Sequence, residues 1–210
     1  MTAVTVVDHP VLAHRLAQLR DRRTSSDAFR QLISDVSGFL AYEALRDLGT
    51  DAGTVDTPVA DAASVRRVSE VVLLVPILRA GLGMVQAIQE IVPLTEVAHV
   101  GLRRDEATLR SEVYLNRLPQ DLSGRRVIVC DPMLATGGSL GQVCELVRAR
   151  GAAEIVALCI VASEPGLAAF GGLHPGVRVY CAAVDPNLND AGYIVPGLGD
   201  AGDRLFGPPD

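Results

Sequence analysis

The sequence predicts an α/β fold: a doubly wound, mainly parallel sheet with a helical arm at the amino end and a hood at the carboxyl end. Short apolar runs of strand length alternate with helix-length amphipathic segments, which is typical of strand-helix-strand units. Hydrophobic residues make up 49% of the 210 residues but aromatic residues only 4%, so the core is aliphatic, as in buried parallel sheets. A chain of this length holds one sizeable core, and we expect a single domain.

The charge and the cysteines exclude several classes of protein. The formal net charge of -6 argues against a broad nucleic-acid-binding surface, which is normally basic. The four cysteines are spread without a close pair, which indicates reduced, buried thiols rather than a zinc cluster or a disulfide framework. No stretch is long and apolar enough to cross a bilayer, and the first residues do not read as a secretion signal. We therefore expect a soluble, cytoplasmic protein with no membrane partner.

Residues 1–60 are expected to form the helical arm. Apolar residues recur at helical spacing over 10–22 and again over 29–48. A residue among 25–27 can cap the second helix, and Gly49 can end it.

Two features of this arm have more than one interpretation. The basic cluster of Arg20, Arg22 and Arg23 is interpreted as a solvated helix end, in preference to an anion site. Residues 50–61 are polar and interrupted by glycine and proline, which indicates a loop or an edge strand.

The core is expected between residues 70 and 184. Its predicted strands are the apolar runs at 71–75, 97–102, 127–130, 155–161 and 177–183. Its predicted helices lie at 82–91, 140–150 and 165–170. Pro76 is expected to stop the first strand. Gly151 is expected to end the helix at 140–150.

The most informative stretch is residues 131–139, which join the strand at 127–130 to the next helix. We call it the phosphate loop. A helix start has unpaired N–H groups and partial positive charge, so it favours an anion, and Gly137 and Gly138 let the backbone approach closely. Asp131, at the carboxyl end of the strand, can accept hydrogen bonds from sugar hydroxyls. The loop has no lysine, which distinguishes it from a nucleoside-triphosphate loop.

The phosphate loop resembles the 5-phosphoribosyl 1-diphosphate (PRPP) signature of the phosphoribosyltransferases, in the form of the uracil phosphoribosyltransferase family. Stretches within 8–26, 76–83 and 192–204 also resemble that family. The resemblance covers nearly the whole chain. It implies the type I phosphoribosyltransferase fold and a pentosyltransferase that converts uracil and PRPP to uridine 5'-monophosphate (UMP) and pyrophosphate in pyrimidine salvage.

The resemblance also implies which residues bind PRPP. Arg79 would bind the diphosphate, because a guanidinium is always charged and grips two oxygens at once; an ordinary surface arginine is the alternative. Asp131 would hold the ribose as the only acid there, since Cys130 precedes it, although a helix-capping role is the alternative. By the same resemblance, the rest of the loop would also contact PRPP: Pro132, Met133, Leu134, Ala135, Thr136, Gly137, Gly138 and Ser139.

Residues 103–118 are polar and connect two predicted strands, so we expect a mobile flap. The resemblance singles out Arg104 as a PRPP contact, and a solvated hairpin is the alternative. The family usually has a proline and an acid near Arg110 and Ser111. Because of this departure, the resemblance does not predict the closed conformation of the flap.

Residues 185–210 are rich in glycine and proline, do not look like a core element, and are expected to form the hood. Unshielded backbone groups there can match the edge of a pyrimidine dione and reject cytosine, whose amino group would face a donor. By resemblance, Ile194, Gly199, Asp200 and Ala201 bind uracil, and Asp200 also contacts PRPP. Asp200 joins Arg79 and Asp131 as the expected catalytic residues; a flexible tail is the alternative.

The expected cofactor is Mg²⁺, held largely by the substrate, because no side-chain cluster reads as a dedicated metal site. The four histidines match no ligand spacing and receive no role. The resemblance implies a homodimer or higher homo-oligomer with contacts through the arm, and some relatives use GTP as an activator.

Two other functions are alternatives. An RNA-binding regulator on the same scaffold is disfavoured by the acidic charge. A transferase for a purine or for orotate is the nearer alternative; orotate requires an added cation in the hood, where Arg204 is available.

Overall fold

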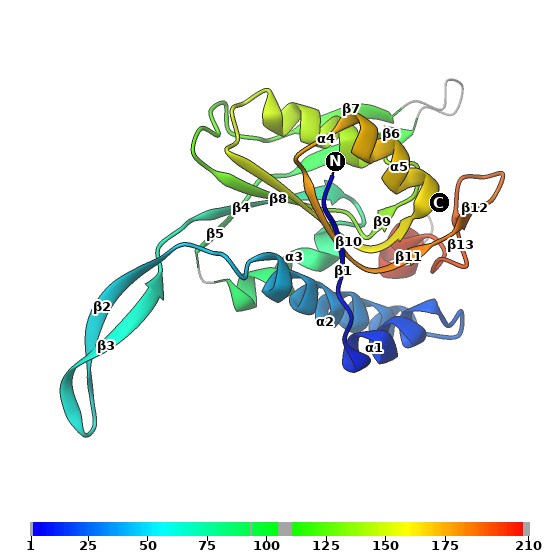
Figure 1. Ribbon diagram of the computed structural model, residues 1–210. Helices are drawn as coiled ribbons and strands as arrows, with labels where there is room; N and C mark the ends of the chain where they lie inside the picture. The colour runs from blue at the N-terminus through cyan, green and yellow to red at the C-terminus, as the bar shows by residue number, and fades with distance from the viewer. Residues whose placement is uncertain (1, 93, 105–110, 208–210) are drawn as a thin grey trace.

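A central parallel sheet dominates the computed structural model, which describes residues 2–92, 94–104 and 111–207 (Figure 1). The strand order is β1-β11-β10-β8-β4-β6-β7, with β5 also pairing with β4 and β9 with β10. The strands are β1 (Val4–Val6), β4 (Val72–Leu78), β5 (Thr95–Val97), β6 (Val100–Arg104), β7 (Ser111–Asn116), β8 (Arg126–Cys130), β9 (Met133–Leu134), β10 (Glu154–Ser163) and β11 (Arg178–Asp185). Strand β7 is antiparallel to β6, and the other described pairs of this sheet are parallel.

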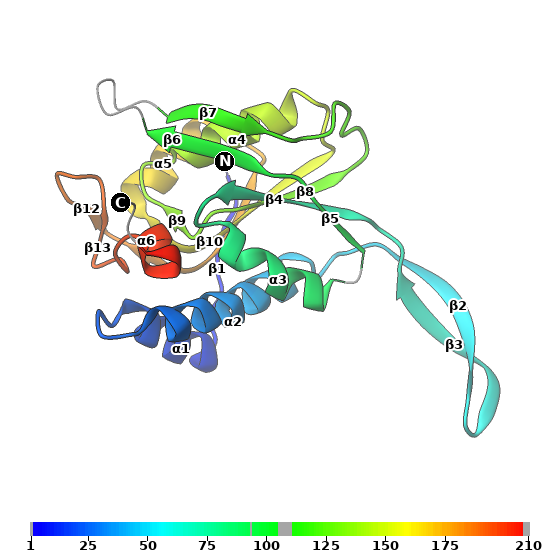
Figure 2. The same cartoon turned by 180° about the vertical axis from the view of Figure 1, so that it is seen from behind.

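Helices cover both faces of the sheet (Figures 1 and 2). One face carries α1 (Pro10–Arg20), α2 (Ser26–Ala44), α3 (Leu82–Ile91) and α6 (Ala201–Phe206), and the other carries α4 (Gly138–Arg148) and α5 (Glu164–Leu173). Successive residues of a strand point to opposite faces, so in β8 Ile128 joins the first core and Val127 and Val129 join the second. The predicted doubly wound α/β fold is confirmed.

Strand β4 continues through Pro76 to Leu78, so the prediction that this proline stops the strand is wrong. The reason is the pairing on one side of β4. Its pairing with β5 ends at Leu74 and its pairing with β6 begins at Ile77. Pro76 lies between these two pairings, where no N–H is needed for a hydrogen bond to a neighbouring strand. The missing N–H of proline therefore does not interrupt the sheet. The same change of partner divides the single strand predicted at 97–102 into β5 and β6.

The two helices predicted in the first sixty residues are found as α1 and α2. They pack against the sheet and do not project, and α2 contributes Phe29, Ile33 and Leu40 to the core. The projecting element is instead a hairpin of β2 (Thr50–Thr57) and β3 (Ala60–Val68), drawn in cyan in Figures 1 and 2. Most of its residues are exposed or half-exposed, so its pairing does not follow from burial of a hydrophobic face.

The hood is partly a core element, contrary to the prediction for residues after 185. It contains β12 (Asn187–Leu188) paired with β13 (Ile194–Val195), followed by α6. Four apolar side chains of the hood are buried in the core with α2 and α3: Ile194, Leu198, Ala201 and Leu205. Burial of these residues fixes the end of the chain against the body of the molecule.

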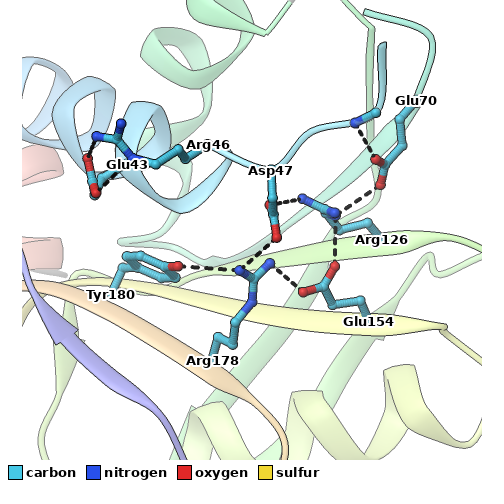
Figure 3. A network of polar contacts seen from close by, with 9 residues as sticks. Glu43, Arg46, Asp47, Glu70, Arg126, Glu154, Arg178 and Tyr180 are labelled. Atoms are coloured by element: carbon cyan, nitrogen blue, oxygen red, sulfur yellow. Dashed lines mark hydrogen bonds and ion pairs between the residues drawn. The ribbon is translucent and has the colours of Figure 1, made fainter. Parts of the chain in front are cut away.

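A network of ion pairs lies at the amino edge of the sheet (Figure 3). Arg126 at the start of β8 contacts Asp47, Glu70 and Glu154 at 2.8–2.9 Å. Arg178 at the start of β11 contacts Asp47 at 3.1 Å and also pairs with Glu154. In the described part of the chain, no helix is long and apolar enough to span a membrane.

Candidate active site

A cavity of about 430 Å³ lies where the carboxyl ends of β4 and β8 meet the hood. Its lining comes from three parts of the chain: Ala80 after β4, Asp131, Met133 and Ala135 in the phosphate loop, and residues 191–194 and 199–202 in the hood. The predicted ribose contact Asp131 therefore shares one cavity with every predicted uracil contact. Parallel sheets place their ligands at this edge.

Gly137 forms the turn that begins α4. Its φ of 80° lies in the left-handed region that favours glycine. A Cβ atom at Gly137 would lie 3.1 Å from both the Gly166 oxygen and the Phe170 Cβ atom. Glycine thus permits close packing of the phosphate loop on α5, and the start of α4 supplies the backbone N–H groups that an anion requires.

Ser163 supports the phosphate loop from behind, a role that the sequence does not predict. Its hydroxyl donates to the Ala135 oxygen at 2.5 Å and accepts from the Gly166 N–H at 2.9 Å. Ser163 is fully buried. A serine before Glu164 and Pro165 is a recognisable helix cap, but its bond to a residue 28 positions earlier has no local signal.

Asp131 lines the cavity directly after β8. Burial raises the pKa of its carboxyl group to about 7, and the hydrogen bond from the Met133 N–H, at 3.4 Å, opposes this only in part. The preceding Cys130 is fully buried, and burial raises the pKa of its thiol to about 12. Asp131 is therefore the titratable group of this segment that reaches the cavity.

The other residues of the phosphate loop differ in how far they are exposed. The side chains of Pro132 and Leu134 are buried, so only their backbone is placed to contact a ligand. The Pro132 oxygen already accepts from the N–H groups of Ile160 and Val161. Thr136 and Gly138 are exposed, whereas Ser139 is partly buried.

Arg79 follows β4 next to Ala80, but it is not one of the residues that line the cavity, and its side chain instead pairs with the hood. Its Nη2 atom lies 3.4 Å from Asp203 Oδ1, and half of its side chain is exposed. The Leu78–Arg79 peptide bond is cis. At Gly81, a Cβ atom would lie 2.2 Å from the Cys130 oxygen, so glycine is required for this loop to pass so close to β8.

The predicted flap coincides with the antiparallel pair β6–β7. Arg104 is the last residue of β6, and its side chain lies outside the described part of the structure, as do residues 105–110. Arg103 donates to Glu112 Oε2 at 2.8 and 2.9 Å. The structure thus places the strands of the flap but not its predicted PRPP contact.

In the hood, Asp200 caps α6 by accepting from the Asp203 N–H at 2.9 Å. The same Asp203 pairs with Arg79, so two of the predicted catalytic residues are linked through it. Gly199 has a φ of 78°, and the Val195–Pro196 peptide bond is cis. Ile194 is buried beneath this turn.

Arg20 is not a solvated helix end, which corrects the prediction for that residue. Its guanidinium makes two 2.7 Å hydrogen bonds to Asp185 and a third, at 2.8 Å, to the Gly197 oxygen. Arg204, the cation considered for orotate, donates instead to backbone oxygens of α1, the residue after α1 and the hood. Both arginines belong to the attachment of the hood.

Within the described residues, no group of three or more histidine, cysteine or acidic side chains is arranged to hold a metal. Asp131 and Asp200 are the acids that line the cavity. This donor set fits a hydrated divalent cation held mainly by a bound diphosphate, and does not fit a cation held by the protein alone.

Comparisons with known proteins agree with this geometry. A family model described as uracil phosphoribosyltransferase matches residues 6–208. Proteins of that name from Clostridium perfringens and Symbiobacterium thermophilum are each 48% identical to this chain over 207 residues, with 99% of both chains covered. The one from Kineococcus radiotolerans is 50% identical, covering 97% of this chain and 98% of its own.

Solved structures show the same fold. The AQ2163 protein from Aquifex aeolicus has a TM-score of 0.91 and 34% identity, with 97% of this chain and 98% of the other covered. A hypoxanthine phosphoribosyltransferase from Trypanosoma cruzi has a TM-score of 0.51 at 12% identity, covering 78% of this chain and 76% of its own. The second likeness concerns the fold alone.

Proposed function

The chain belongs to the uracil phosphoribosyltransferase family, and on this premise we propose how its cavity carries out the reaction of that family. The enzyme is a pentosyltransferase that converts uracil and PRPP to UMP and pyrophosphate in pyrimidine salvage. The observation that carries the proposal is the single cavity shared by the phosphate loop and the hood.

PRPP would lie along the carboxyl edge of the sheet. Its 5'-phosphate would bind the N–H groups at the start of α4, supported by the left-handed turn at Gly137. The ribose hydroxyls would donate to Asp131 in its ionised form. Arg79, at the end of β4, would bind the diphosphate with the backbone of the adjoining glycines. Arg104 would add a contact from the flap.

Uracil would bind in the hood half of the cavity, to Ile194, Gly199, Asp200 and Ala201. Because these residues offer mainly backbone groups, recognition would depend on matching donors and acceptors rather than on charge. Orotate is disfavoured, because Arg204 is already engaged by three backbone oxygens.

In the reaction, a uracil ring nitrogen attacks the anomeric carbon of the ribose and loses its proton, while the bond from that carbon to the diphosphate oxygen breaks. Alignment of the two substrates and stabilisation of the leaving group by Arg79 would provide most of the rate enhancement, with no covalent enzyme intermediate. Mg²⁺ bound to the diphosphate would neutralise its charge. Chelation with EDTA should abolish activity, and added Mg²⁺ should restore it.

The test is incubation with labelled uracil, PRPP and Mg²⁺, alongside cytosine, hypoxanthine and orotate. Of the four bases, only uracil should be converted to its nucleoside monophosphate. Arg79→Ala and Asp131→Asn should lose most activity while remaining folded. Parent-rate turnover by Asp131→Asn would contradict the ribose contact.

A separate variant tests whether uracil binds in the hood. Gly199→Val places a branched side chain at a φ of 78° and should raise the KM for uracil more than the KM for PRPP. Equal increases would contradict the placement of uracil in the hood.

We infer that the enzyme forms a homodimer or larger assembly. A groove of about 790 Å³ beside α1, α2 and α3 includes the exposed aromatic side chains of Phe39 and Tyr42. The projecting hairpin β2–β3 is a second contact surface, because two-stranded ribbons are marginally stable alone. Sedimentation equilibrium tests the assembly, and initial rates with and without GTP test activation.

A further inference from the structure

We propose that Arg20 and Arg204 are positioning residues that hold the uracil-binding segment of the hood in its active conformation. We call this pair and its partners the arginine clasp. The proposal rests on the proposed function, because it assigns a role within the same uracil site. Neither arginine lines the cavity. Their effect on the base must therefore pass through the backbone of the hood.

Arg20 crosses from the end of α1 to the end of β11. Its two terminal nitrogens bind the two oxygens of Asp185, and one of them also donates to the Gly197 oxygen. In return, the Gly197 N–H donates to Asp185 Oδ2 at 2.8 Å. Both polar backbone groups of Gly197 are thus bound by a single ion pair, whose side chains are only 24% and 6% exposed.

Arg204 crosses in the opposite direction, from α6 to the end of α1. It donates to the Leu19 and Asp21 oxygens, which lie at the negative end of the α1 dipole, and to the Leu198 oxygen at 2.9 Å. Its guanidinium carbon lies 4.1 Å from the centre of the Phe29 ring. Helix α1 and the hood therefore each contribute one arginine that binds the backbone of the other.

The residues bound by the clasp separate the two parts of the uracil site. Gly197 and Leu198 lie between Ile194 and Gly199, and a Cβ atom at Gly197 would come within 2.1 Å of the Ile194 oxygen. The clasp uses the carbonyl oxygens of both residues. Neither residue lines the cavity, and the clasp fixes the backbone between the two parts of the site that do.

The same contacts explain why two arginines are used. A guanidinium is a planar fork that can bind a carboxylate with two parallel hydrogen bonds and still reach a third acceptor, whereas an ammonium is a point donor. Asp185 accepts three hydrogen bonds, two from Arg20 and one from Gly197. An uncharged or shorter partner at either position cannot satisfy this set.

The kinetic test compares Arg20→Ala and Arg204→Ala with the parent enzyme. Each substitution should raise the KM for uracil about tenfold or more, as expected when hydrogen bonds to a charged group are lost. The KM for PRPP should change by less than about twofold, a conventional margin for no effect in these assays. Arg125→Ala is the matched control, because it removes an arginine from a surface ion pair with Glu96. It should change neither constant.

Asp185→Asn provides a second route if Arg20→Ala fails to fold. It keeps the size of the side chain but leaves at least one of the three donors unpaired, and it should reproduce the selective increase in KM for uracil. The double variant Arg20→Ala/Asp185→Asn should be no worse than the more severe single variant. Equal increases in both KM values, or an unchanged KM for uracil in folded variants, would overturn the proposal.

Amide hydrogen exchange of the unliganded enzyme separates this proposal from the proposed function. Arg20→Ala should increase exchange in residues 194–201 and leave residues 131–139 unchanged. Failure of the parent enzyme to form UMP would refute the proposed function, whatever the exchange shows. Unchanged exchange in residues 194–201 of an active enzyme would refute the clasp.

Discussion

A carboxyl group that lines a cavity in a folded protein is unfavourable when it ionises without a partner, and Asp131 is in this position. Burial raises its pKa to about 7, from a value near 3.8. Between these two pH values, the folded protein binds the proton more tightly than the unfolded chain does. The contribution of Asp131 to the free energy of unfolding is therefore largest at low pH and is lost as the pH rises towards 7.

This pKa predicts that Asp131→Asn stabilises the protein while removing activity. At pH 8 the free energy of unfolding should rise by about 1–3 kcal/mol, because an amide carries no charge to desolvate. At pH 4 the difference should nearly vanish. Urea unfolding at the two pH values measures it, with Asp61→Asn on the exposed hairpin as a control that changes neither. A destabilised Asp131→Asn at pH 8 would contradict the raised pKa.

The same group predicts the pH dependence of substrate binding. If ribose hydroxyls bind the ionised form, the affinity for PRPP should fall about tenfold for each unit of pH below 7. Titration calorimetry between pH 6 and 8 measures this dependence. Asp131→Asn corrects for ionisation of PRPP itself, and a parallel slope in this variant would show that Asp131 is not responsible.

At the scale of single residues, the sequence predicts positions better than partners. The loop motif predicts Asp131 as a ribose contact, and this residue lines one cavity with Ile194, Gly199, Asp200 and Ala201. The partners of Arg20 and Ser163 were not predictable, because Asp185 is 165 positions and Ala135 28 positions away. Such bonds depend on the completed fold and have no local pattern.

At the scale of elements, the phosphate loop depends on α5. The Ser163 hydroxyl holds the Ala135 carbonyl, whose negative end would otherwise be free to turn towards a bound phosphate. Gly166 permits this approach, since a Cβ atom there would lie 2.0 Å from the Ala135 oxygen. The shape of the loop is thus partly determined by the strand and helix that follow.

Ser163→Ala should therefore weaken PRPP binding and destabilise the protein. The loss of a helix cap and of one buried hydrogen bond corresponds to about 1–3 kcal/mol of unfolding free energy. The matched control is Ser25→Ala, which removes the N-terminal cap of α2 and no hydrogen bond to the phosphate loop. Both variants should lower the melting temperature, but only Ser163→Ala should raise the KM for PRPP relative to that for uracil. If the two variants behave alike in KM, Ser163 is only a cap.

The prediction of elements from sequence succeeded where burial is strong. The helix at 82–91 is found at those residues, and the helix predicted at 140–150 occupies 138–148, because apolar periodicity is set by the face each helix buries. The hairpin β2–β3 was not resolved from a loop, since both of its faces are largely exposed and its residues lack clean alternation. Pro76 was misleading because the strand partners, not the strand itself, determine whether a proline fits.

At the scale of the whole molecule, chemistry and stability are concentrated at opposite edges of the sheet. The cavity lies at the carboxyl edge, and the network of Arg126 and Arg178 lies at the amino edge (Figure 3). Burial alone would raise the pKa of Asp47, but its hydrogen bond to Arg126 and the charges of Arg126 and Arg178 lower it overall. This stabilisation is present above the unfolded pKa and is lost as the pH falls through the folded pKa.

Arg126→Ala should lower stability without affecting catalysis. It leaves Glu70 without an arginine and Asp47 and Glu154 with Arg178 alone, which corresponds to about 2–4 kcal/mol at pH 7. Thermal unfolding should show a smaller loss as the pH falls below 3.8, because the lowered pKa of Asp47 lies below that value and its ion pairs are lost on protonation. Both KM values should match the parent at a temperature where the variant is folded. A change in KM for either substrate would mean that the two edges are coupled.

The pairing of β1 with β11 connects segments that are far apart in the sequence, since Val4 lies opposite Val179. During synthesis, the first strand therefore has no partner until most of the polypeptide has left the ribosome. The hood emerges later still, and its attachment to α1 closes a loop of comparable length. Long loops of this kind slow folding, so the enzyme should acquire its active form only after the hood has left the ribosome.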